Sequence, residues 1–243
     1  MPKYLQVADD VLGQIRSGAL QPGRQVPSES ELMARYGVSV GTVRKAMAEI
    51  RTSGLVETLH GKGSYVVAPP SVRCKSSDRF RRSHWTVGED IHLGVAVKAS
   101  VLYVGPAAAS PGIADRLGVA PGAQVLVRRR LYFSDGAPAE ESTSYLPWGL
   151  AEEIPELLAE NPGPGGIYAR LEDRGHELTE FVETVRARPA VKDECAMLGL
   201  SPGAPVMLVT REAVSREGRI VEICDTVMAA DRFVLEYRVP AAE

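Results

Sequence analysis

Apolar positions in residues 1–54 recur at the spacing of three short helices. In the first helix they run from Tyr4 to Ile15 every three or four residues, and Gly18 can end it. Ser28 and Glu31 then stand three residues apart, which is the spacing of a capping box at a helix start. The pattern predicts an amphipathic helix, a turn, and a second helix that begins after Ser28.

The third helix is expected directly after the second. Gly37 supplies a stop for the second helix, and Ser39 is placed to cap the next one. The inner face of this third helix is expected at Val43, Ala46, Met47 and Ile50. Two short helices around a tight turn that contains glycine predict a helix-turn-helix.

Two β-rich runs, residues 55–59 and 64–67, flank a loop with two glycines. A hairpin directly after a helix-turn-helix is the wing of a winged helix. Residues 69–84 are rich in proline, serine and basic side chains and have no apolar periodicity, so we predict a linker there. The domains are therefore expected at 1–68 and 85–243.

An internal repeat organises the second domain. Residues 117–123 are matched 81 positions later by residues 198–204, and both contain a Pro-Gly pair. The match continues with two pairs of charged residues, Arg130 with Arg211 and, after one inserted position, Glu140 with Glu222. Each copy is typical of a helix end, a turn and two returning strands. Together they predict a pseudo-symmetric α+β domain with one antiparallel sheet.

Charge is unevenly distributed along the chain. Residues 1–84 carry 13 basic and 7 acidic residues, whereas 85–243 carry 15 and 24, within a total net charge of −3. The basic first part favours attraction to nucleic-acid phosphates. No segment resembles a signal peptide or a membrane span, and the three separate cysteines suit a reducing compartment. We therefore expect a cytoplasmic protein with no membrane partner.

Exposed positions of the third helix and the wing are the candidate contacts to double-stranded DNA. The N-terminal residues of such a helix reach base edges in the major groove, where Arg suits guanine and Thr can contact thymine. Basic side chains beside it can hold phosphates or enter the minor groove. For each basic residue the alternative is a solvated surface charge. The candidates are Arg35, Ser39, Val40, Gly41, Thr42, Arg44, Lys45, His60, Gly61 and Lys62.

Ordered motifs in both halves resemble a known family. The first half resembles the GntR-family DNA-binding domain at residues 26–29, 36–39, 42–44, 46, 54–56 and 61–63. The second half resembles the UTRA ligand-sensing domain of the HutC-type subfamily at residues 117–118, 130, 136, 138, 144–147, 198, 203, 211, 218, 222 and 231–232. The resemblance implies a homodimer on an inverted-repeat operator, and a chorismate-lyase-like sensor domain whose small-molecule effector alters DNA binding. Repression is the default in this family.

The repeat also supplies candidate effector contacts. Arg can clamp a carboxylate or a phosphate, and Glu can accept hydrogen bonds from hydroxyls or amines. Where sugar-phosphate-sensing members carry a second Arg and a Glu, this chain has Tyr132 and Ser142, which argues against that effector class. We expect an anionic effector held by Arg130, Tyr132, Glu140, Ser142, Arg211 and Glu222. The alternative is that each Arg pairs with a nearby Glu as scaffolding.

Other functional classes have less support. No Ser/His/Asp or Cys/His arrangement supports an enzyme, and the four histidines lack metal-ligand spacing, so we expect no catalytic residue, metal or cofactor. An architectural DNA-binding protein would not need the large acidic second half. The sequence therefore predicts a sequence-specific transcription regulator, a repressor whose operator affinity an effector controls.

Overall fold

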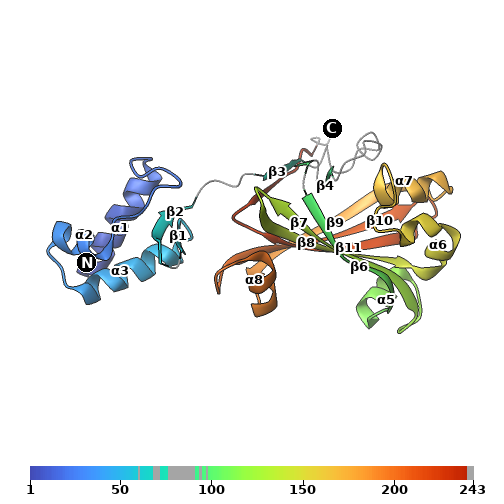
Figure 1. The fold of residues 1–243 in the computed structure, drawn as a ribbon, viewed down its shortest axis with the longest axis horizontal. Coiled ribbons are helices and arrows are strands. Elements are labelled where there is room, and N and C mark those ends of the chain that lie inside the picture. The colour runs from blue at the N-terminus through green and yellow to red at the C-terminus, as the bar shows by residue number, and fades with distance from the viewer. Residues whose placement is uncertain (60, 68–71, 76–90, 93–94, 97, 240–243) are drawn as a thin grey trace. The chain divides into compact units, whose positions relative to one another are not determined.

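The chain forms two compact units, Met1–Pro69 and Pro70–Glu243 (Figure 1). The computed structural model describes residues 1–59, 61–67, 72–75, 91–92, 95–96 and 98–239. Among these residues, no helix is both long and apolar enough to cross a membrane.

The described part of the first unit contains three helices and a hairpin, as predicted. The helices are α1 (Lys3–Arg16), α2 (Glu29–Tyr36) and α3 (Val40–Thr52). Strands β1 (Val56–Leu59) and β2 (Gly63–Val66) pair antiparallel and form the wing. A single bridge from Gln25 to Tyr65 ties the segment before α2 to the wing.

Local hydrogen bonds fix the turn between α2 and α3. Ser28 Oγ accepts from the backbone N–H of Glu31 at 3.3 Å, and the Glu31 carboxylate accepts from the backbone N–H of Ser28 at 2.7 Å. The hydrogen bonds that the Glu31 carboxylate accepts from the backbone N–H and the hydroxyl of Ser28 lower the pKa of Glu31. Gly37 ends α2 at a φ of 59°, a left-handed conformation that favours glycine, and Ser39 caps α3 through the N–H of Thr42. The predicted capping box and stop are both confirmed.

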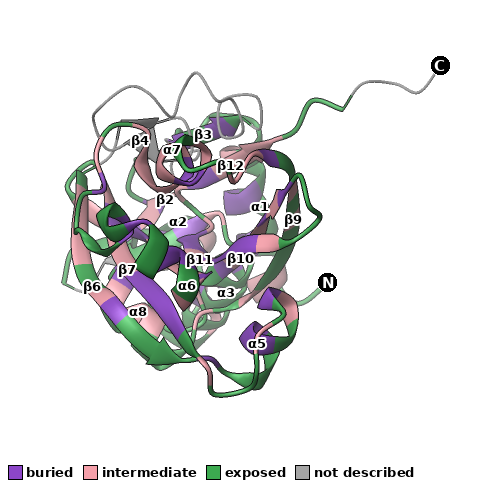
Figure 2. Cartoon of the chain, turned by 90° about the vertical axis from the view of Figure 1, so that its right-hand side faces the viewer, coloured by how far each residue is buried: buried purple, intermediate pink, exposed green. Residues whose placement is uncertain are grey.

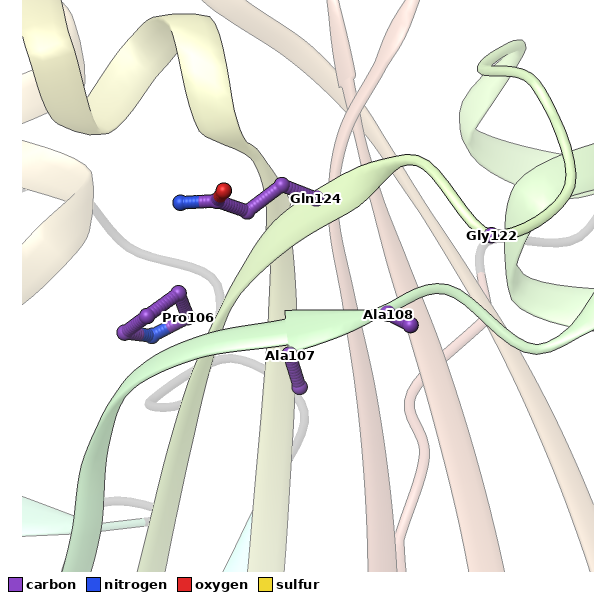
Figure 3. A pocket seen from close by; sticks show the side chains of 5 residues that line it. All are labelled: Pro106, Ala107, Ala108, Gly122 and Gln124. Carbon is purple, nitrogen blue, oxygen red and sulfur yellow. The ribbon is translucent and has the colours of Figure 1, made fainter.

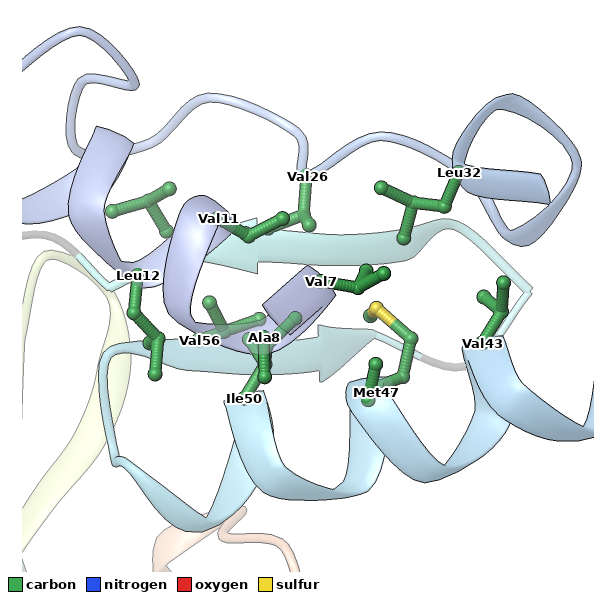
Figure 4. Packing of buried hydrophobic residues seen from close by; sticks show 12 residues of the cluster. Val7, Ala8, Val11, Leu12, Val26, Leu32, Val43, Met47, Ile50 and Val56 are labelled. Carbon is green, nitrogen blue, oxygen red and sulfur yellow. The ribbon is translucent and has the colours of Figure 1, made fainter. Parts of the chain in front are cut away.

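One apolar cluster joins the helices to the hairpin (Figure 4). Helix α1 contributes Val7 and Val11, and the four residues predicted for the inner face of α3 are all buried. Burial of each large apolar side chain contributes about 1.5–3 kcal/mol, so this cluster holds α3 against α1 and leaves its other face exposed.

Six strands within residues 98–239 of the second unit form one antiparallel sheet. The strand order is β6-β7-β8-β11-β10-β9. The strands are β6 (Lys98–Ala108), β7 (Gln124–Ser134), β8 (Ala137–Pro147), β9 (Leu178–Pro189), β10 (Pro205–Ser215) and β11 (Ile220–Ala229). Strands β8 and β11 pair at the centre and join two three-stranded halves.

The predicted repeat is present as two structural copies. Each copy runs strand, helix, strand, strand, with α5 (Pro111–Leu117) in the first and α8 (Lys192–Leu198) in the second. Helix α5 ends at Gly118 with a φ of 67°, and α8 ends at Gly199 with a φ of 65°. The repeated Leu-Gly pair therefore marks two equivalent helix C-termini.

Helices cover both faces of the sheet. Figure 1 shows α5 and α8 on one side and α6 (Trp148–Glu153) with α7 (Gly166–Asp173) on the other; the 3-10 helix η2 (Pro155–Leu158) lies between α6 and α7 in the chain. Leu126 packs with α6 and α7, whereas Val125 and Val127 pack with α5, because successive strand residues face opposite sides. This buried stretch of β7 is purple in Figure 2.

The hydrophobic pattern of residues 181–188 is ambiguous between helix and strand. In the structure they lie in the edge strand β9, where most side chains are exposed on both faces. The linker prediction for 69–84 is wrong at Val72–Lys75, which form β3 and pair in parallel with β12 (Phe233–Glu236). Val72 and Cys74 alternate into an apolar cluster with Met228. The rest of the predicted linker, residues 69–71 and 76–84, lies outside the described residues. Beyond it, β4 (Ile91–His92) and β5 (Val95–Ala96) form a short antiparallel pair.

The capping box yields a stability prediction for the first unit. Ser28→Ala should lower its free energy of unfolding by about 1 kcal/mol, because an N-terminal N–H of α2 loses its acceptor. The measurement is hydrogen exchange in urea on the full chain, followed in peptides from residues 1–66. Ser30→Ala is the matched control, since Ser30 lies inside α2 and is exposed. Equal losses for the two variants would contradict the prediction.

Candidate DNA-binding and effector sites

The start of α3 presents the predicted base-reading residues to solvent. Ser39, Val40 and Gly41 are exposed, and Val40 keeps 43% of its surface accessible. Thr42 is half-buried, and its Oγ1 lies 3.1 Å from Ser39 Oγ. Arg44 and Lys45 are exposed one turn further along. A helix N-terminus with exposed hydroxyl, methyl and guanidinium groups has the chemistry to read base edges.

Both arginines among the helical candidates have carboxylate neighbours. Arg44 Nε donates to Glu29 Oε2 at 3.4 Å, and Arg35 Nη2 lies 3.7 Å from Asp10 Oδ2. The guanidinium groups remain largely exposed, so they are oriented by these contacts without being buried. Sequence analysis did not anticipate either acidic partner.

The tip of the wing is held from two sides. The backbone carbonyl of Lys62 accepts from Gln25 Nε2 at 3.2 Å and from the Tyr65 hydroxyl at 3.1 Å. Gly63 has a φ of 109°, a backbone conformation that residues with a Cβ rarely adopt, so this position favours glycine. The turn at Gly61 and Lys62 is exposed, while predicted residue His60 lies outside the described residues.

All six predicted effector residues lie on one face of the sheet, the face that α6 and α7 cover. The strand register sets Arg130 opposite Ser142 and Tyr132 opposite Glu140. On the second half, Arg211 lies opposite Cys224, which itself lies opposite Ser144 of the first half. We call this set the polar layer: Arg128, Arg130, Tyr132, Glu140, Ser142, Ser144, Arg211, Glu222 and Cys224.

Arg128 of the polar layer was missed by sequence analysis. It is buried at 3% exposure and donates to the backbone carbonyls of Leu157, Ala159 and Glu160. Burial, and then the charge of Arg130, lower the pKa of Arg128 to about 10. Arg130 Nη2 donates to the Glu160 carbonyl at 2.6 Å. These two arginines fasten the segment after η2 to the sheet.

Glu222 is fully buried and is held by two hydroxyls. It accepts from Ser144 Oγ at 2.6 Å and from the hydroxyl of Tyr168, a residue of α7. Burial raises the pKa of Tyr168 well above its usual value. Glu222 is therefore tied to the helical cover, which sequence analysis had no means of seeing.

Arg211 lies beside this pair with an unused donor. Its guanidinium carbon is 5.3 Å from the centroid of the Tyr168 ring. Burial disfavours its charged form, but Tyr168, Cys224 and Glu222 outweigh that effect and raise the pKa of Arg211. Its Nε is shielded from solvent and has no hydrogen-bond partner among the described residues. A shielded donor of this kind costs free energy unless an acceptor reaches it.

The remaining predicted residues complete a shielded cluster of polar groups. Glu140 is 1% exposed, and burial raises the pKa of Tyr132. Ser142 Oγ lies 3.1 Å from Cys224 Sγ, and burial raises the pKa of that thiol. The cluster combines guanidinium, carboxylate and hydroxyl groups, which suits a polar small molecule.

A separate hollow of about 280 Å³ lies where β6 ends and β7 begins (Figure 3). Pro106, Ala107, Ala108, Gly122 and Gln124 line it, and none of these five is charged. It contains no residue of the polar layer. Its chemistry gives no reason to place an anionic effector there.

Two family models match the chain. The model of the UTRA domain matches residues 92–234, more than half of the chain, and that of the bacterial regulatory proteins of the gntR family matches residues 3–66. The chain belongs to the GntR family of bacterial regulators. Its winged helix and its antiparallel α+β domain correspond to these two matches, and the UTRA domain places it among the HutC-type members, as the resemblance implied.

Relatives of this GntR-family protein are transcription regulators. A histidine utilization repressor of Pseudomonas aeruginosa is 30% identical over 90% of this chain and 83% of its own. The NagR repressor of Bacillus subtilis is 25% identical over 96% and 93%. A crystal structure described as a GntR-family transcriptional regulator has 29% identity and a TM-score of 0.72, with 100% and 99% covered. The protein is thus a transcription regulator and not an enzyme.

The buried arginine of the polar layer yields a second prediction. Arg128→Met should destabilise the second unit of this GntR-family protein by about 3 kcal/mol, because carbonyls on the η2 segment lose a buried donor. Hydrogen exchange in residues 155–173 of the full chain should accelerate. Arg129→Met is the control, since Arg129 faces the other side of β7, pairs with Glu141 there, and has a side chain that is 43% exposed. Unchanged exchange in Arg128→Met would contradict the anchoring role.

Proposed function

We propose that this GntR-family protein is a sequence-specific repressor whose operator affinity is controlled by a small-molecule effector bound in the polar layer. The observation that carries the effector part is the shielded Arg211 Nε, a donor without a partner among the described residues. Arg130 is half-exposed on the same sheet face, across β8 and β11, and in this proposal the two guanidinium groups contact different parts of the anion. The repressor names of two relatives support repression.

Operator recognition is assigned to α3 and the wing. The start of α3 would enter the major groove, and Lys62 at the wing tip would contact phosphate or the minor groove. A homodimer would place two such heads about 34 Å apart, one helical turn of DNA, on an inverted repeat. The basic charge of the first part of the chain supports this orientation toward DNA.

The route from effector to DNA is assigned to β3. Val209 and Met228 lie on the face of the sheet that carries Arg211 and Glu140, and they pack with Cys74 of β3. A change in the polar layer therefore reaches β3 through direct contacts. Effector and DNA need a coupling of only about 1–3 kcal/mol to change operator affinity 5- to 150-fold.

Operator recognition is tested first by selecting, at near-physiological salt, the genomic DNA fragments of the source organism that the protein binds. One dominant inverted repeat is expected. Arg44→Ala should then weaken operator binding by about 1–3 kcal/mol and relax the preference at one base pair, whereas Lys62→Ala should weaken binding to all sequences alike. Lys98→Ala, an exposed change in the second unit, serves as the control.

If folded, dimeric protein enriches no motif, the selection is repeated with cell extract, which would supply a corepressor. If that selection also enriches no motif, the proposal is overturned. Equal weakening of operator and random DNA by Arg44→Ala would contradict base reading by that residue.

The effector part is tested by release of a labelled operator. Anionic substrates of the enzymes encoded beside the operator are the compounds to screen. Arg130→Gln and Arg211→Lys should each abolish most of the release that the active compound causes, because each removes one arm of the anion clamp. Arg129→Gln is the matched control on the opposite face of β7. Unchanged release in both polar-layer variants would leave the arginines with a scaffolding role.

A further inference from the structure

A carboxylate on α1 holds the arginine near the end of α2. Asp10 Oδ2 lies 3.7 Å from Arg35 Nη2 and accepts a hydrogen bond from the Tyr36 hydroxyl. Gln14 Nε2 donates to the same oxygen at 3.1 Å. The Arg35 guanidinium also lies 5.4 Å from the centroid of the Tyr36 ring. Two neutral donors thus fix the carboxylate that orients Arg35.

This cluster contributes little to the stability of the fold. The side chains of Arg35 and Asp10 are 53% and 48% exposed, and water screens ion pairs that are this accessible. The core of the first unit is made by a separate set of apolar side chains. The effect of Asp10 should therefore appear in DNA binding and not in folding.

We propose that Asp10 is a positioning residue that sets the specificity of this protein for its operator over other DNA. Asp10 orients the Arg35 guanidinium, and its negative charge reduces the net positive charge that this site presents to DNA phosphates. The proposal rests on the proposed function and on the sequence-based prediction that Arg35, in α2, contacts DNA.

Binding to random DNA depends on charge and not on geometry. Its affinity comes from cations that neutralise phosphates, and any phosphate within reach will do. A carboxylate beside Arg35 lowers the positive charge presented there, which weakens this binding. One unit charge about 7 Å from a phosphate in water changes affinity about threefold.

Binding to the operator depends on geometry as well. A guanidinium that is already oriented loses less conformational freedom when it makes a specific contact, which favours the operator complex. The aromatic ring and the fixed carboxylate both restrict Arg35. Asp10 should therefore weaken binding to random DNA and have little or no unfavourable effect on the affinity for the operator.

The decisive variant is Asp10→Asn, which keeps an oxygen acceptor for the Tyr36 hydroxyl and removes the charge. Affinities of the full chain are measured for the selected operator and for a random duplex of equal length, at about 0.01 M salt, where a Debye length of about 30 Å leaves this charge largely unscreened. We expect random-duplex affinity to rise about threefold and operator affinity to stay level or fall. The ratio of the two should therefore fall at least about threefold.

Asp9→Asn is the matched control for net charge. Asp9 is exposed and lies one position earlier on α1, which turns it about 100° away around the helix axis. We expect it to shift both affinities by the same factor. Tyr36→Phe separates the two effects, because it keeps the charge and removes one of the two donors that hold the carboxylate. It should weaken the operator complex and leave random-duplex affinity unchanged. Thermal unfolding of each variant checks that it folds.

Arg35→Ala distinguishes failure of the predicted Arg35 contact from failure of the proposed role of Asp10. If it leaves operator affinity unchanged, the proposed contact is wrong and the role of Asp10 falls with it. If it weakens operator binding, Asp10→Asn is repeated in that background, where it should no longer alter the affinity ratio. A ratio unchanged by Asp10→Asn in the parent chain, or altered equally by Asp9→Asn, would overturn the proposal while leaving Arg35 as a contact.

Discussion

The second unit depends on the pairing of β8 with β11. These strands join the two copies of the repeat into one sheet, with Ser144 opposite Cys224 and Ser142 opposite Thr226. Side chains alternate along a strand, so a slip of one residue would turn Glu140 or Glu222 to the other face. The polar layer exists because this pairing turns the charged residues of both copies to the same face of the sheet.

Different segments cover the two ends of the sheet face that carries the polar layer. The segment with α6, η2 and α7 follows the first copy and packs on an apolar cluster around Leu126 and Ala213. Strands β3 and β12 cover a second apolar cluster around Val209 and Met228. The charged residues lie between these clusters, where their solvent access is low and unsatisfied donors are costly.

Local and periodic features were predictable from sequence, whereas contacts between distant segments were not. The capping box at Ser28 and the 81-residue repeat depend on neighbouring residues or on a match along the chain, and both are present. Strand β9 has too few buried positions to show a period, and β3 is too short to be seen without its distant partner β12. Arg128 and Tyr168 gain their roles only once η2 and α7 fold over the sheet.

The register between β8 and β11 also limits how an effector can act. Because a slip between β8 and β11 would turn buried charges away from their partners to the other face of the sheet, the sheet cannot respond by changing its pairing. The response must then come from its covers, through α7 by way of Tyr168 or through β3 by way of Val209 and Met228. Of these two covers, β3 is the one that follows the first unit directly in the chain. In the proposed mechanism, movement of β3 would therefore reach the DNA-binding unit through the shorter covalent path.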